Sequence, residues 1–332
     1  MIWMAIFLQV MVPVLLIYLS GFLLQKALKL DIKPISTLAM YLLLPFLVFK
    51  TFYERKLDSN FGYILVITLV IMLALLGLGL IIAKILHYNQ KKLNAFLLTT
   101  IFSNSGNFGV PLALFAFGNS AMKYAMPIMI IHTIYMGVVG IYIAAGGSGK
   151  QQTIGYALGS VFKQPMNYVI VPGILLNRWG VTLPENLMKW IDMISKTAIP
   201  IIMLALGMQL ANVVASKIDW ASVGFASFVK LIVAPLLAYL ICLAFPINPL
   251  LRNIIVIMTA MPSAANTTIY AIQYNAEPDY VSACTFVSTI LSFISLTFLL
   301  NLVVWIMRSE LSLVKKFPAS FLIGVIGDCA LL

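Results

Sequence analysis

Charged side chains are scarce in this sequence. Asp, Glu, Lys and Arg make up 9% of the 332 residues, whereas a soluble globular domain carries about 25%. Hydrophobic residues make up 62%. This composition excludes an ordinary soluble protein. Because helices satisfy their own backbone hydrogen bonds in lipid, long apolar runs predict an all-α membrane protein.

Acidic residues, histidines and cysteines number only ten, two and three. No acid lies between Asp58 and Glu185, or between Asp219 and Glu277. A membrane-embedded enzyme needs a nucleophile with a base, or a metal cluster, and these residues offer almost no material for either. We therefore expect no enzymatic activity, no metal and no cofactor. The cysteines share no metal or disulfide spacing and are interpreted as small apolar residues: Cys242, Cys284 and Cys329.

Basic residues outnumber acidic ones by 21 to 10, giving a net charge of +11. In a soluble protein this excess would indicate nucleic acid. Here the bases lie in short loops between apolar runs, where an anionic membrane surface attracts them, so no nucleic-acid partner is expected. The two sets of loops carry nearly equal numbers of bases. The basic loop after the first run, with Lys26, Lys29 and Lys33, favours both termini outside.

Apolar runs locate the membrane helices, since a span needs about 20 mostly apolar residues. Ten charge-free runs are present, two of them short. The helix containing the eighth run must begin near Trp220 and so include Lys230. We predict ten transmembrane helices, followed by a C-terminal tail, 308–332, that is interfacial or disordered. The runs are 1–25, 34–49, 59–83, 93–122, 124–149, 164–177, 197–216, 231–251, 253–276 and 280–307.

A glycine-rich stretch, 146–152, is typical of a flexible linker. The linker loop, 146–163, separates a first five-helix segment, 1–145, from a second, 164–307. Homologous segments with an odd number of spans lie upside down relative to each other. Similarly placed prolines, Pro13 with Pro172 and Pro45 with Pro200, favour two inverted repeats. The alternative is that prolines are simply common in membrane helices.

Helices 4 and 9 are both interrupted by small and polar residues, at 103–111 and 261–268. Pro111 lacks an N–H group, and Gly106 and Gly109 permit backbone angles closed to other residues. An unpaired backbone group is costly in hydrocarbon, so such a break persists only in protein or beside a wet cavity. Matched interruptions indicate a midplane substrate site in a transporter. The alternative is a pair of kinked helices packed through small residues.

These interruptions resemble those of the auxin efflux carrier family, which includes plant carriers and bacterial permeases. The resemblance extends over about residues 1 to 307. Its most specific motif is followed by family-like Leu112, Leu114, Phe115 and Gly118. The two matching motifs are Asn104-x-Gly106-Asn107-x-Gly109-x-Pro111 and Met261-Pro262-Ser263-Ala264-Ala265-Asn266.

The resemblance implies an inverted-repeat fold similar to that of bile-acid and sodium/proton transporters, in which broken helices 4 and 9 cross. It implies helices 1, 2, 6 and 7 as scaffold and homodimer surface, with helices 3 to 5 and 8 to 10 as a moving transport domain. The implied substrates are small organic anions. Plant carriers have a long regulatory loop where this chain has a short one, so a bacterial organic-acid permease in the plasma membrane fits better than an auxin carrier.

Half-helix N-termini present unpaired N–H groups and a partial positive charge, which favours a bound carboxylate. We expect direct substrate contact from the amides of Asn107 and Asn266. Capping of the freed backbone ends is the alternative role of each amide. Lys230 is a further candidate, because an intramembrane charge is costly and usually functional, unless it snorkels to an interface. The remaining substrate-binding candidates are Asn104, Ser105, Ser263 and Thr267, and the structural positions of the crossover are Gly106, Gly109, Pro111 and Pro262.

Both interruptions lack acids, so proton coupling or uniport ranks above sodium symport, and an anion channel is a further rival. His132 could face the crossing and titrate, although a lone helical histidine is more often a packing residue. His87 is expected at a membrane edge. Asp192 and Lys196, one helical turn apart, are expected to pair near an interface.

Overall fold

The computed structural model describes residues 7–54, 60–146, 159, 164–212 and 219–313. Every regular element in these residues is a helix, which confirms the predicted all-α class. The linker loop, apart from 146 and 159, lies outside the described residues, and so does the tail from 314 onwards. The interpretations of these two segments therefore stay predictions.

The helices follow one another with short connections. Up to residue 145 they are η1 (Phe7–Met11), α2 (Val12–Leu28), α3 (Ile32–Leu38), η2 (Ala39–Leu43), α4 (Leu44–Glu54), α5 (Asn60–Ile85), α6 (Gln90–Ile101), η3 (Ser105–Gly109), α7 (Val110–Phe117), η4 (Gly118–Ala121), α8 (Met122–Tyr135), η5 (Met136–Gly140) and α9 (Ile141–Ala145). After the linker they are α11 (Pro165–Arg178), α12 (Glu185–Ala211), α13 (Trp220–Phe228), η6 (Val229–Val233), α14 (Ala234–Leu243), α15 (Pro249–Thr259), α16 (Ala265–Tyr274) and α17 (Pro278–Leu313).

Seven helical runs in the described residues are long and apolar enough to cross a membrane, so the chain is a multi-pass membrane protein. Helix length alone does not show the ten-span plan. The reason is local: α6, α15 and α16 have 12, 11 and 10 residues because they end or begin at a break, and α11 has 14. The continuous run Ser105–Ala145 counts once although it includes a turn at η4.

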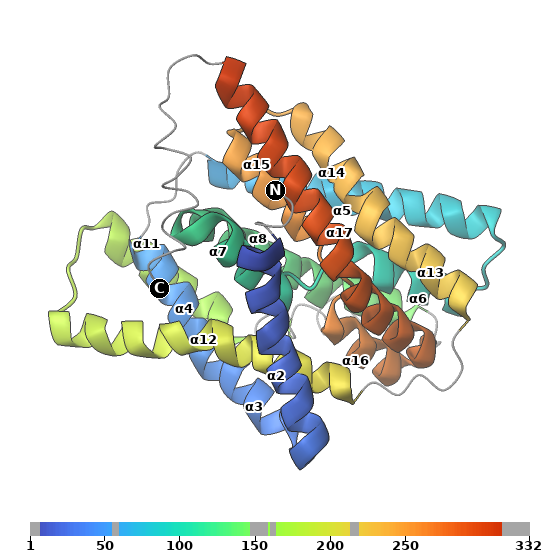
Figure 1. Cartoon of the computed structure of the whole chain (residues 1–332), viewed down its shortest axis with the longest axis horizontal. Coiled ribbons are helices and arrows are strands. Elements are labelled where there is room, and N and C mark those ends of the chain that lie inside the picture. The colour runs from blue at the N-terminus through green and yellow to red at the C-terminus, as the bar shows by residue number, and fades with distance from the viewer. Residues whose placement is uncertain (1–6, 55–59, 147–158, 160–163, 213–218, 314–332) are drawn as a thin grey trace.

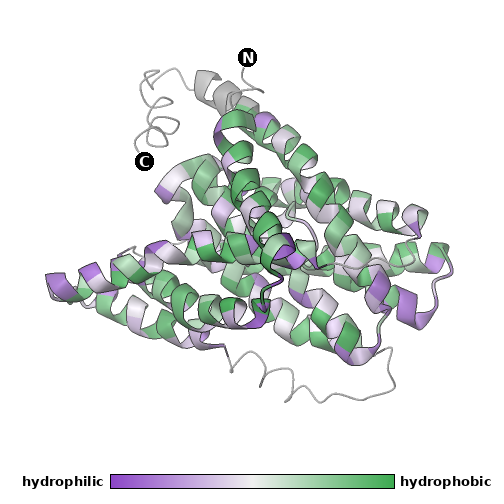
Figure 2. Cartoon of the chain, turned by 60° about the horizontal axis from the view of Figure 1, so that its bottom comes forward, coloured by the Kyte–Doolittle hydropathy of each residue, from purple (hydrophilic) through white to green (hydrophobic). Residues whose placement is uncertain are grey.

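The helices form two groups that lie side by side. Figure 1 shows α2, α3, α4, α11 and α12 on one side and α5, α13, α14, α16 and α17 on the other. In Figure 2 hydrophobic residues follow the lengths of the helices, while the most hydrophilic segments lie mainly near helix ends. This distribution suits a lipid environment along the helices and water at their ends.

Within the first group, α2 and α12 cross at two glycines. A Cβ atom on Gly21 would lie 2.2 Å from the Leu204 carbonyl oxygen, and one on Gly207 would lie 2.1 Å from the Tyr18 carbonyl oxygen. Glycine at both positions therefore lets the two backbones touch, as is common between membrane helices.

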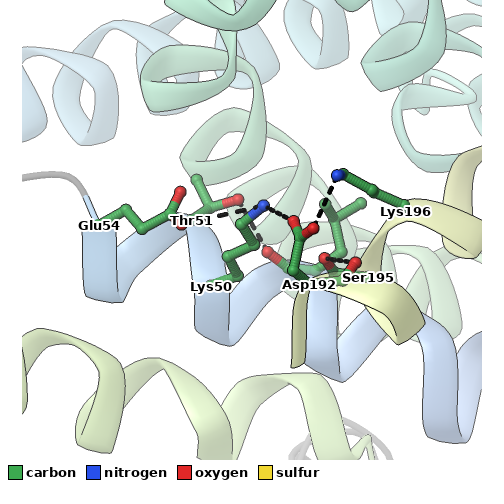
Figure 3. Close-up of polar contacts among 7 residues, drawn as sticks. Lys50, Thr51, Glu54, Asp192, Ser195 and Lys196 are labelled. Carbon is green, nitrogen blue, oxygen red and sulfur yellow. Dashed lines mark hydrogen bonds and ion pairs between the residues drawn. The ribbon is translucent and has the colours of Figure 1, made fainter. Parts of the chain in front are cut away.

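An ion-pair cluster also joins α4 to α12 (Figure 3). The Asp192 carboxylate accepts from Lys196 at 2.7 Å and from Lys50 of α4, and Lys50 lies 3.8 Å from Glu54. The predicted pairing of Asp192 with Lys196 is confirmed. Because Lys50 of α4 bonds to Asp192 of α12, the cluster holds the two helices together.

The glycine contact predicts a strong effect of one added methyl group. Gly207→Ala places a Cβ against a backbone oxygen, so the helices must separate, and we expect a loss of about 1–3 kcal/mol, as for an overpacked core. The melting temperature in detergent measures the loss. Gly77→Ala is the matched control, because nothing lies within 4 Å of its Cβ position. Equal melting temperatures for the two variants would contradict this packing.

Candidate functional site

The two predicted interruptions meet inside the protein. One break separates α6, which ends at Ile101, from η3, and the other separates α15, which ends at Thr259, from α16. Ser103 and Ser263 lie opposite each other in a short antiparallel bridge. The Asn104 N–H donates to the Pro262 carbonyl at 2.8 Å, and the Ala264 N–H donates to the Phe102 carbonyl at 3.0 Å. We call this meeting of 102–104 with 260–264 the crossing.

Two serine side chains exchange hydrogen bonds across the crossing. The Ser103 hydroxyl donates to the Thr259 carbonyl of α15 at 3.1 Å, and the Ser263 hydroxyl donates to the Thr99 carbonyl of α6 at 2.6 Å. Each serine thus satisfies a carbonyl in the last turn of the opposite broken helix. Both serines are buried, so these bonds offset the cost of opening the helices in a low-dielectric setting.

The non-helical part of the first break is shorter than predicted. Only 102–104 leave the helix, and the chain resumes as a π-turn at Ser105. Among the described glycines, positive φ occurs at Gly118 and Gly180, so Gly106 and Gly109 do not use the backbone freedom expected of them.

Gly109 packs closely against Met258. Gly109 has helical φ and ψ, and a Cβ there would lie 2.8 Å from the Met258 sulfur. Pro111 lies in the first turn of α7, where its missing N–H is not needed. Pro262 accepts the Asn104 hydrogen bond within the crossing.

Helix ends give the crossing its charge pattern. The C-terminal ends of α6 and α15 bring carbonyl groups to it, while η3 and α16 begin there with their N–H ends, where the Ser105 N–H donates to the Ser103 carbonyl and the Thr267 N–H to the Ala264 carbonyl. A helix end carries about half an elementary charge, negative at the C-terminus and positive at the N-terminus. The crossing therefore has two negative and two positive poles in a small volume.

Lys230 brings a side-chain amino group, which can carry a positive charge, beside the negative poles. It lies in η6, its side chain is fully buried, and its Nζ donates to the Ser103 Oγ at 2.7 Å and to the Ile101 carbonyl at 3.5 Å. These contacts place the ammonium group on the C-terminal end of α6. The alternative of a lysine that snorkels to an interface is wrong for this structure.

Three predicted amides surround the same breaks. Asn104 is buried, and its Nδ2 has no hydrogen-bond partner among the described residues. Asn107 is half-buried in η3, and its main-chain carbonyl accepts from the Tyr18 hydroxyl of α2 at 3.0 Å. Asn266 is half-buried in the first turn of α16. The structure therefore gathers these amides at or beside the helix N-termini.

The predicted hydroxyls are more strongly engaged. Thr267 is buried, and its Oγ1 donates to the Ala264 carbonyl at 2.6 Å. Ser105 is buried, and its Oγ lies 2.6 Å from the Nδ1 atom of His132. Thr267 and Ser105 reinforce the starts of the half-helices, whereas Ser263 satisfies a carbonyl at the C-terminal end of α6.

Two residues that contact the first break are not among the substrate-binding residues predicted from the sequence. His132, from α8, reaches the first break through Ser105, and Tyr18, from α2, reaches it through Asn107. The sequence does not decide whether His132 titrates at the crossing or only packs there, because no local pattern distinguishes these two roles. Tyr18 carries no sequence signal, since its partner lies 89 residues away.

Outside the crossing, a pocket lies at the starts of α6, α13 and α17. Its lining includes Lys92 and three carboxylates, those of Asp219, Glu277 and Asp279. Lys92 is already engaged, at 3.7 Å from Glu277 and 3.4 Å above the Tyr280 ring. With three acids and one base, this pocket does not suit an anion.

Polar helix breaks that meet inside a multi-pass membrane protein are typical of secondary transporters. The chain belongs to the membrane transport protein family, whose family model matches residues 6–300. This confirms the resemblance, and the protein is a transporter and not an enzyme.

Three relatives match most of the chain. An uncharacterized transporter of Methanocaldococcus jannaschii is 25% identical over 88% of this chain and 96% of its own length. One of Methanothermobacter thermautotrophicus is 26% identical over 87% and 95%. A protein of Rhizobium meliloti named "Putative malonate transporter" is 27% identical over 81% and 86%.

The serine exchange predicts a stability effect at the crossing. Ser263→Ala leaves the buried Thr99 carbonyl without this donor, so we expect a loss of about 1–3 kcal/mol. Thermal unfolding in detergent measures it. Ser20→Ala is the matched control, because it removes an exposed hydroxyl bond to the Leu16 carbonyl within one helix. If Ser263→Ala were as stable as the control, the exchange would not hold the crossing together.

Proposed function

We propose that this protein is a secondary transporter of small organic anions, such as dicarboxylates or auxin-like carboxylates, and that the crossing is its binding site. One observation carries the proposal: a buried lysine, Lys230, contacts the crossing from which two half-helix N-termini emerge. No acidic residue occurs in either interrupted segment. Positive poles without nearby carboxylates favour a bound anion.

Asn107 and Asn266 are the proposed direct contacts with the substrate. Both amides are half-buried, and among the described residues no hydrogen bond is found for either side chain, so their N–H groups are available to a carboxylate. Asn104 offers a third, buried amide. Ser105, Ser263 and Thr267 hold the backbone around the site, and Lys230 supplies the counter-charge.

The relative named for malonate supports the substrate class. Malonate is a short dicarboxylate, and its two charges suit a site with two positive helix ends and one lysine. A bacterial organic-acid permease in the plasma membrane, with both termini outside, is the corresponding proposal for this chain.

The proposed architecture is ten helices in two inverted segments, 1–145 and 164–307. The reciprocal bonds of Ser103 and Ser263 support it, because each serine follows the threonine of its own break by four positions. The contacts of Gly21 and Gly207 are reciprocal in the same way. Such pairs are expected from a two-fold axis in the membrane plane.

Transport would proceed by alternating access of an elevator type. The group of α2, α3, α4, α11 and α12 forms the scaffold and a homodimer surface, and the helices that carry the crossing move against it. The hydrogen bond from Tyr18 to the Asn107 carbonyl joins the two parts. That bond would break when the site moves.

A double variant tests the proposed site. Wild-type protein reconstituted in liposomes should take up labelled malonate, and Asn107→Ala combined with Asn266→Ala should abolish uptake because two carboxylate donors are lost. Asn119→Ala, an exposed amide in η4, is the control and should transport normally. Unchanged uptake in the folded double variant would refute the site assignment.

Ion substitution separates the rival mechanisms. Uniport or proton coupling predicts equal malonate-induced thermal stabilisation in sodium and potassium buffers, because no carboxylate is present at the breaks to bind sodium. Stabilisation that requires sodium would support a sodium-coupled symporter instead. Internal unlabelled malonate should accelerate uptake of labelled malonate, as alternating access requires. Without such acceleration, an anion channel would be the better account.

A further inference from the structure

His132 lies in a small pocket against the crossing. Its Nδ1 atom is 2.6 Å from the Ser105 hydroxyl. The pocket that it lines reaches the first break at Ser103 and the end of α15 at Thr259, and Thr68 of α5 closes another side. The imidazole therefore contacts the break directly and also faces a space that a water molecule or proton can use.

Two groups able to carry positive charge thus flank one break. Lys230 holds the Ser103 hydroxyl at 2.7 Å, and the Ser105 hydroxyl lies 3.4 Å from the Ser103 carbonyl and 2.6 Å from His132. Lysine and histidine are linked through two serines two positions apart. A charge bound at the crossing is felt by both groups.

The two negative charges of a bound dicarboxylate would give Lys230 and His132 a joint role. A short dicarboxylate carries two negative charges near neutral pH, and Lys230 offsets one of them. Moving a net charge through the low-dielectric membrane interior is costly. A carboxylate beside an imidazole favours its protonated form, and one added proton would neutralise the loaded site.

We propose that His132 is the proton-carrying residue of this transporter: it binds one proton when a dianion occupies the crossing and releases it when the dianion leaves. This inference rests on the proposed function and deepens it. The proton comes from the aqueous side open to the site, and no covalent bond other than N–H forms or breaks.

Ser105 can accommodate both protonation states. When Nδ1 has no hydrogen, the Ser105 hydroxyl donates to it. When Nδ1 is protonated it donates to the Ser105 oxygen, and the hydroxyl can turn to the Ser103 carbonyl 3.4 Å away. Protonation therefore requires a hydroxyl rotation and leaves the crossing intact.

Other titratable groups near α8 have partners of their own. The Lys230 Nζ donates to the Ser103 hydroxyl. The hydroxyl of Tyr135, which also lines the pocket, donates to the Leu65 carbonyl at 3.4 Å. No carboxylate lines this pocket among the described residues. On α8 itself, Lys123 lies over the Tyr124 ring and the Tyr124 hydroxyl accepts from Asn248. The elements packed against α8 have these contacts among others: Lys50 with Asp192 and Glu54, Tyr53 with the Val181 carbonyl, Arg252 over the Tyr239 ring, and Tyr63 against the Phe245 ring.

The chain offers a matched control because it contains two histidines. His87 lies in the turn between α5 and α6 with a left-handed φ of 51°, and asparagine tolerates that conformation better than most residues, so His87→Asn suits it. This variant leaves His132 as the sole imidazole. Histidine-labelled His87→Asn protein should show, by NMR, conversion of its one imidazole to the doubly protonated form when malonate is added.

Calorimetry in two buffers of different ionisation enthalpy gives an independent readout. Wild type and His87→Asn should take up about one proton per malonate bound. His132→Gln should bind malonate without that proton, and its uptake should lose acceleration by an inward proton gradient. Binding with unchanged imidazole signals, or equal proton uptake in His132→Gln, would overturn the inference while leaving the proposed function standing. If wild type bound neither malonate nor an indole carboxylate, the proposed function itself would be overturned.

Discussion

The site depends on two reciprocal hydrogen bonds, in which the Ser103 hydroxyl donates to the Thr259 carbonyl and the Ser263 hydroxyl donates to the Thr99 carbonyl. A helix broken inside a membrane leaves carbonyl and N–H groups that lipid cannot satisfy. Here each break supplies the partners that the other lacks, through two serine hydroxyls and two main-chain bonds. Neither break would be stable alone, so the two halves of the chain must come together for the site to exist.

This arrangement also creates charge without acidic residues. Four helix ends meet, and Lys230 lies on the C-terminal end of α6. The lysine offsets the negative pole there, so the positive poles of η3 and α16 stay available for a substrate. His132 reaches the same break through Ser105. The proposed transport of a dianion with a proton follows from this placement of poles, lysine and imidazole.

Sequence reasoning predicted the features that are local. The membrane class, the two interruptions and the start of α13 at Trp220 follow from composition and from small or polar residues within apolar runs. Contacts between distant segments could not be predicted, such as Tyr18 with Asn107 or Lys50 with Asp192. The backbone freedom expected of Gly109 is not used, because its φ and ψ are helical, and what could not be predicted is that a Cβ there would lie 2.8 Å from the Met258 sulfur.

The most direct test of the account is the position of the bound anion. Crystals grown with 2-bromomalonate would show the bromine by anomalous scattering. The account predicts a peak beside the crossing, within contact distance of Asn107, Asn266 or Lys230. A peak in the pocket of Lys92 and Asp219, with the crossing empty, would contradict it.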